Sequence, residues 1–120
     1  FVARKKQTEK DKRINAEIKR LNKILKDLPE DKQSIAEGLI SEAAFMRATL
    51  EDLKDDINEN GVVDEMPQGS YSIKRESPAV KTYNTMVQRY NGTCKEIFNL
   101  LPKEVVVEED DGFEAFIGNK

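Results

Sequence analysis

The chain has 120 residues, enough for one domain but not comfortably for two, and its formal net charge is −3. Charged residues make up 36% of the sequence and hydrophobic residues 38%, so a compact monomer would have a thin core. Long helices would use this composition better, because each could bury one apolar stripe against a second subunit.

Several classes of protein are disfavoured by what the composition lacks. There is no histidine and a single cysteine, Cys94, which leaves no His/Cys metal site and no intrachain disulfide. The nucleotide-binding and hydrolase patterns GxxxxGK[ST], GxGxxG and GxSxG do not occur either. No run approaches the roughly 20 apolar residues of a membrane span. We therefore expect a soluble cytoplasmic protein with no membrane partner, no catalytic residues, no metal and no cofactor.

The first predicted helix covers residues 8–28. Five apolar residues alternate at spacings of four and three and share one helical face: Ile14, Ile18, Leu21, Leu25 and Leu28. Thr8, followed by Asp11, can cap the start, and Pro29 ends the helix because a residue before proline disfavours the α region.

The second predicted helix covers residues 30–60. Its start is marked either by Pro29 or by the capping-box pair Ser34 and Glu37, and its end by Gly61. Its apolar positions again follow one another at spacings of four or three: Ile35, Leu39, Ala43, Met46, Leu50, Leu53 and Ile57. Two heptad-patterned helices joined by a tight turn predict an antiparallel hairpin of coiled-coil type.

The third predicted helix, residues 78–101, follows a different kind of segment. Residues 61–76 contain two short β-prone pieces, which predict a small β-hairpin or an ordered loop that leans on the helices. Ser77 and Pro78 then mark the helix start. Its stripe is the most regular in the chain: Val80, Tyr83, Val87, Tyr90, Cys94, Ile97 and Leu101. The predicted fold is mainly α and oligomeric, with one helical domain (1–104) and an acidic C-terminal tail (105–120).

Cys94 and two tyrosines on the apolar stripe of the third predicted helix are interpreted as structural residues and not as reactive or ligand-binding ones. Cys94 lies where a small buried hydrophobe belongs, and no base is available to make it a nucleophile. Tyr83 and Tyr90, one heptad apart, could stack on nucleic-acid bases, but their place on an apolar stripe favours the core.

Two acidic pairs, Asp55-Asp56 and Asp110-Asp111, could bind Mg²⁺. Adjacent residues on a helix point about 100° apart and do not converge on one ion, so solvated carboxylates are the simpler interpretation.

Charge is distributed unevenly along the chain. Residues 1–28 carry ten Lys/Arg against four Asp/Glu, whereas residues 102–120 carry two against six. The candidate nucleic-acid contacts are the basic residues of the first segment: Arg4, Lys5, Lys6, Lys10, Lys12, Arg13, Lys19 and Arg20. The alternatives are a solvated helix start, or neutralisation of opposite segments between neighbouring subunits.

A stretch near the middle of the chain resembles the small terminase subunits of tailed bacteriophages. The similar elements are Asn58–Val63 at the join between helix and loop, Gly69 in the loop, Ser77-Pro78-Ala79, the tyrosine-bearing helix with Tyr83 and Tyr90, and Leu100-Leu101-Pro102. The resemblance covers roughly residues 58–104 and implies a ring-forming protein of the bacterial host cytoplasm. It further implies binding to the packaging start site on viral double-stranded DNA and recruitment of the large subunit, which carries the ATPase and nuclease. The helix-turn-helix that many such subunits use for DNA is not evident here.

The sequence therefore predicts three functional surfaces. Residues of the second and third helices would hold subunits together: Leu39, Met46, Leu50, Leu53, Val87, Tyr90 and Ile97. The basic residues would contact DNA phosphates, and the large terminase subunit would bind the tail through Glu108, Glu109, Asp110, Phe113, Phe116 and Ile117. The alternative function is a coiled-coil adaptor or structural protein that binds no nucleic acid.

Overall fold

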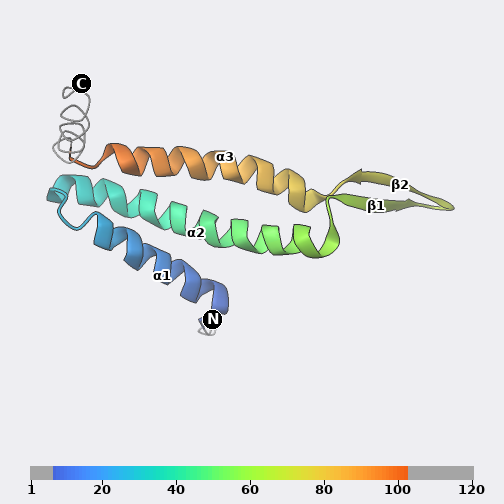
Figure 1. The fold of residues 1–120 in the computed structure, drawn as a ribbon, viewed down its shortest axis with the longest axis horizontal. Helices are drawn as coiled ribbons and strands as arrows, with labels where there is room; N and C mark the ends of the chain where they lie inside the picture. Colours follow the sequence, from blue (N-terminus) through green and yellow to red (C-terminus); the bar gives the residue numbers. More distant parts are fainter. Residues whose placement is uncertain (1–6, 103–120) are drawn as a thin grey trace, which may run out of the picture.

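The computed structural model describes residues 7–102. It contains helix α1 (Glu9–Ile24), helix α2 (Glu30–Asn60), strands β1 (Val63–Gln68) and β2 (Tyr71–Glu76), and helix α3 (Pro78–Asn99). The predicted mainly helical fold, with a small two-stranded sheet between the second and third helices, is confirmed. Helix α2 lies between α1 and α3, and the β-hairpin projects beyond the far end of the α2–α3 pair (Figure 1). None of the helices in this described part is both long and apolar enough to cross a membrane.

Helix α1 begins as the sequence predicts and ends earlier. The Asp11 amide donates to the Thr8 hydroxyl over 3.0 Å, and the Thr8 amide donates to the Asp11 carboxylate over 3.1 Å, which forms a reciprocal cap. The helix ends at Ile24, four residues short of the predicted limit. Leu28 precedes Pro29 and cannot stay helical, so Leu25 to Leu28 form a tight turn instead, closed by a 3.2 Å bond from the Leu28 amide to the Leu25 carbonyl.

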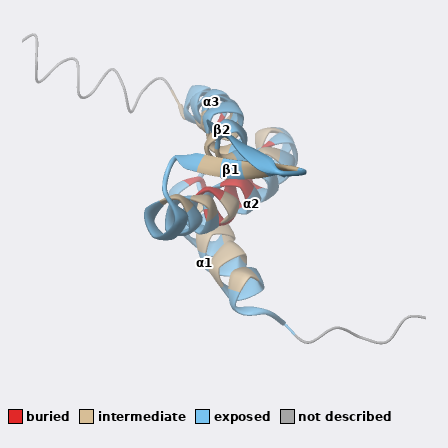
Figure 2. Ribbon diagram, turned by 90° about the vertical axis from the view of Figure 1, so that its right-hand side faces the viewer, coloured by how far each residue is buried: buried red, intermediate tan, exposed pale blue. Residues whose placement is uncertain are grey.

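Helix α2 has two buried faces because it packs against a helix on each side. It starts directly after Pro29, so of the two predicted starts the proline one is realised and Ser34 lies inside the helix. The buried residues include a run at spacings of four that the alternating stripe does not contain, and three of its four members are alanines: Ala36, Ile40, Ala44 and Ala48. Predicted stripe residue Ile35 is instead 60% exposed. Small residues let α1 approach the α2 backbone closely, and Figure 2 shows the buried positions along α2 between its two neighbours.

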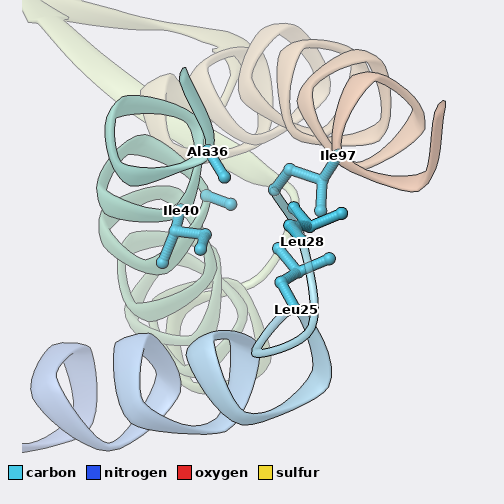
Figure 3. Close-up of a cluster of buried hydrophobic side chains, with 6 residues drawn as sticks. Leu25, Leu28, Ala36, Ile40 and Ile97 are labelled. Carbon is cyan, nitrogen blue, oxygen red and sulfur yellow. The ribbon is translucent and has the colours of Figure 1, made fainter. Parts of the chain in front are cut away.

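The three helices meet in one apolar cluster at the α1–α2 turn. Its buried members are Leu25, Leu28, Ala36, Ile40, Ala43 and Ile97 (Figure 3). Ile97 is the one buried residue of α3, and it anchors that helix on the leucines of the turn. Burial of a side chain of this size stabilises the fold by about 1.5–3 kcal/mol, so the turn end is the firmest part of the described chain.

The β-hairpin differs from the prediction that it would lean on the helices. Its strands pair antiparallel from Val63 opposite Glu76 to Gln68 opposite Tyr71, with Gly69 at φ +64° in the turn. All six residues of β2 are exposed, and the hairpin extends away from the helical body (Figure 1). Gly61, at φ +85°, turns the chain out of α2 in this direction.

Candidate nucleic-acid interface

The structure separates the predicted DNA contacts into groups with different surroundings. Arg4, Lys5 and Lys6 lie outside the described residues. So does the whole predicted large-subunit site: Glu108, Glu109, Asp110, Phe113, Phe116 and Ile117. The other five predicted cations all lie on α1, but only some of them face away from the rest of the protein.

Arg13 and Lys10 point toward α2. The Arg13 guanidinium donates to the Glu51 and Asp52 carboxylates over 2.9 and 2.7 Å, and to the Ala48 carbonyl over 3.2 Å. Lys10 lies 4.0 Å from the Asp52 carboxylate, and its ammonium sits 4.6 Å from the centre of the Phe45 ring. These two side chains therefore hold the N-terminal half of α1 against α2.

Arg20 belongs to a polar cluster that connects all three helices. Its guanidinium donates twice to the Glu17 carboxylate, over 2.8 and 2.6 Å, and this pairing holds the pKa of Glu17 below its usual value. Arg47 of α2 approaches Glu17 to 3.8 Å and donates to the Tyr90 hydroxyl of α3 over 3.3 Å. Burial is the main cause that raises the pKa of Tyr90. Arg20 is thus committed to contacts inside the chain.

Lys12 and Lys19 lie on the opposite, outer face of α1. At about 100° per residue, Lys19 falls about 20° to one side of Lys12 and Lys23 about 20° to the other. All three are exposed, and none forms an ion pair with another described residue. We call Lys12, Lys19 and Lys23 the lysine stripe. Lys26, in the turn that follows α1, is also exposed.

The carboxylates of α1 do not neutralise the lysine stripe. Asp11 caps the helix, Glu9 accepts from Arg13 over 3.0 Å, and Glu17 is bound by Arg20 with only 11% of its side chain exposed. Lys23 and Lys26 were not among the predicted contacts, although their spacing from Lys12 and Lys19 could have been read from the sequence. The missing information was which face of the helix is turned outward.

The predicted oligomerisation residues are divided in the same way. Met46, Leu50 and Ile97 are buried by packing within one chain. Leu39, Leu53, Val87 and Tyr90 are half-buried. Tyr83 and Tyr90 both line the α2–α3 seam and are half-buried there. Three of the seven predicted subunit contacts are therefore already covered within the chain.

Several clefts lie between the helices, but the described residues that line them form no recognisable reaction centre. Within the described part, no three His, Cys, Asp or Glu side chains come together as metal ligands. Cys94 is half-buried on α3. A groove of about 560 Å³ between α2 and α3 has an apolar floor of Phe45, Met46 and Met86.

Comparison with protein-family models, with curated proteins and with solved structures finds no match for this chain. The functional argument consequently depends on the surfaces described above, and chiefly on the lysine stripe.

Proposed function

We propose that this chain is a terminase-type small subunit of a tailed bacteriophage, which assembles into a ring, binds viral double-stranded DNA and recruits a large subunit in the host cytoplasm. The observation that carries the proposal is the lysine stripe, because it leaves a row of cations on α1 that no carboxylate of the same helix neutralises. The resemblance of residues 58–104 to small terminase subunits supplies the biological setting.

The stripe has the dimensions of a phosphate-binding edge. Lys12 and Lys23 are eleven positions apart, which corresponds to about 16 Å along a helix. Duplex DNA carries one phosphate charge per about 1.7 Å of axis, so one such edge can follow several phosphates. Contacts of this kind are weak and insensitive to sequence when single, and a ring multiplies them because each bound subunit raises the effective concentration of the next.

Charge reversal along the stripe tests the DNA-binding part. The triple variant Lys12→Glu, Lys19→Glu, Lys23→Glu should lose DNA affinity in a fluorescence anisotropy titration at low salt. The matched control reverses three exposed lysines on α2 and α3, at Lys54, Lys81 and Lys95, and so changes the net charge equally.

The salt dependence separates a local contact from general attraction. Each lost phosphate contact should reduce the slope of log affinity against log salt by about 0.9 per subunit, or about 2.7 for three. The stripe variant should show this change and the control should not. Equal losses in both triple variants would mean that net charge, and not the outer face of α1, attracts DNA.

The adaptor function remains the second candidate because of one specific observation. Lys10, Arg13 and Arg20, three of the predicted DNA contacts, are occupied by carboxylates within the chain. If the unmodified protein binds no duplex DNA at low salt, the stripe is a solvated helix face and the helices serve protein partners alone.

Recruitment of the large subunit is assigned to residues 105–120, which lie outside the described part. A chain ending at residue 104 should still bind DNA and should no longer retain a large terminase subunit in a pull-down. Retention by the shortened chain would move the recruiting surface onto the helices.

A further inference from the structure

The β-hairpin has one apolar face that no other residue of the described part, 7–102, covers. Residues paired across an antiparallel ladder share a face, so Met66 with Ile73 and Gln68 with Tyr71 lie on one side. Tyr71 is 64% exposed and Ile73 44%. The pair formed by Asp64 and Arg75, joined by a 3.0 Å ion pair, bounds this face toward the helices.

The opposite face of the hairpin is more polar, with Val63 at its base as its one exposed large apolar residue. It contains Glu65 opposite Lys74, Pro67 opposite Ser72, and Val63 opposite Glu76. A two-stranded hairpin is marginal in water without an apolar face covered by something else. A partner that covers the hairpin is therefore expected to bind the face that carries Met66, Tyr71 and Ile73.

The chain also carries an apolar groove that its own hairpin cannot reach. The α2–α3 groove has Phe45, Met46 and Met86 in its floor, and Phe45 is 48% exposed. It lies along the middle of the helices, up to about 27 Å from the start of α3 at the position of Glu96. The hairpin leaves that end of α3 in the opposite direction (Figure 1).

We propose that the apolar face of the hairpin docks into the α2–α3 groove of a second copy of this chain. The charges around the two surfaces are complementary: Glu42 and Glu96 at the groove can receive Arg75, and Arg89 can receive Asp64. The inference deepens the assembly step of the proposed function and depends on it.

The position of Pro67 argues against docking through the outer edge of β1 and favours docking by a face. In a two-residue hairpin the pair next to the turn is hydrogen-bonded, so Pro67 opposite Ser72 is a non-bonded pair and its nitrogen points to the outer edge of β1. The bond from the Ser77 amide to the Val62 carbonyl, 3.0 Å, agrees with this alternation. Proline has no N–H to donate, so β1 is a poor edge for extending the sheet into a neighbour.

A contact between two different surfaces is heterologous. Each subunit gives its hairpin to one neighbour and receives the hairpin of another, so such contacts make a ring when the rotation closes. A face-to-face contact between two hairpins would be isologous and would stop at a dimer.

Point variants on each surface test the docking by native mass measurement. Ile73→Asp places a charge on the apolar face, and its control, Ser72→Asp, places the same charge on the polar face next to it. Gly92→Tyr places an aromatic ring in the groove, at a position where an added Cβ meets no atom within 4 Å. Its control, Gln88→Tyr, lies on α3 outside the groove. Both test variants should be monomers with unchanged circular dichroism, and both controls should assemble like the unmodified chain.

Mixing the two monomeric variants gives the sharpest result. Ile73→Asp retains an intact groove and Gly92→Tyr an intact hairpin, so an equal mixture should form one-to-one dimers and nothing larger. Dimers in neither the mixture nor the separate variants would overturn the proposal, as would full assembly of Ile73→Asp alone.

Disulfide trapping gives an independent readout if a substitution perturbs the fold. In a Cys94→Ala background, Tyr71→Cys and Thr93→Cys proteins should cross-link when mixed and oxidised. Self-cross-linking of the Tyr71→Cys protein without its partner would show a hairpin-to-hairpin contact and overturn the proposal. A wild-type monomer at micromolar concentration would remove the ring of the proposed function together with the docking. An assembled wild type whose Ile73→Asp variant also assembles would remove the docking alone.

Discussion

Replacing Ile97 with alanine should destabilise the fold far more than the same change at Ile35. Ile97 is 7% exposed and packs on the leucines of the α1–α2 turn, whereas Ile35 is 60% exposed. Alanine at residue 97 removes three carbons, about 0.8 kcal/mol each by transfer, or about 2.4 kcal/mol before the cavity is counted. With the cavity the loss should be about 3 kcal/mol, within the range observed for such substitutions. At Ile35 the loss should stay within about 0.5 kcal/mol.

Urea denaturation followed by circular dichroism measures this difference. A domain of this size has a free energy of unfolding of about 5–14 kcal/mol, so Ile97→Ala removes a large part of it. With a urea slope of about 1–3 kcal/mol per molar, its midpoint should fall by about 1–3 M, and that of Ile35→Ala by much less. Equal shifts in the two variants would refute the reasoning, because they would show that the cluster at the turn does not hold α3 in place.

Three further predictions concern the contacts around α1 and two glycines. Arg13→Gln should release the N-terminal half of α1 from α2 and so speed amide hydrogen exchange in that half. Lys12→Gln, at a residue that faces outward, should leave the exchange rates unchanged. Faster exchange in Lys12→Gln than in Arg13→Gln would contradict the placement of these two side chains. The pKa of Glu17 is lowered in the folded chain, so its contribution to stability is present above the ordinary glutamate range and is lost as pH falls through the folded pKa. The stability gap between wild type and Glu17→Gln, measured by urea unfolding at several pH values, should therefore shrink on acidification, and a gap that widened would oppose this sign. Gly61→Ala should lower the free energy of unfolding by about 1–2 kcal/mol, because φ at this residue is +85°. Gly38→Ala, inside α2 with open space around it, should raise the free energy of unfolding by about 0.5–1 kcal/mol. Thermal unfolding compares the two variants, and equal effects would argue against the positive φ at Gly61.

The local pattern of the sequence was sufficient for the three helices and for the starts of α1 and α3, and it offered two starts for α2. Thr8 with Asp11, Pro29 and Ser77 with Pro78 act through atoms within a few residues of themselves, so their effect does not depend on the remainder of the fold. The end of α1 was harder to predict from the sequence, because the turn before Pro29 forms together with the packing of Leu25 and Leu28 onto α3.

The second buried face of α2 could not be read from an alternating apolar stripe. Alanine contributes little to a hydrophobic pattern, and Ala44 and Ala48 are buried only because α1 folds back along that side. The sequence alone does not reveal that α2 packs between two helices, so one buried face was predicted for α2 where the structure has two. The predicted subunit contact was affected in the same way: Met46, Leu50 and Ile97 are covered within the chain.

The periodicity of the chain determined its helical class, because this follows from neighbours three or four positions apart. Its composition gave the basic character of α1, and the β-prone pieces between the second and third helices favoured a hairpin or an ordered loop. Only the tertiary structure decided which cations of α1 remain available to a partner. Arg13 and Lys12 are adjacent in the sequence, yet one is bound to the carboxylates of α2 and the other is exposed. The rotation of α1 about its own axis makes that difference, and it is set by the distant residues on which the helix packs.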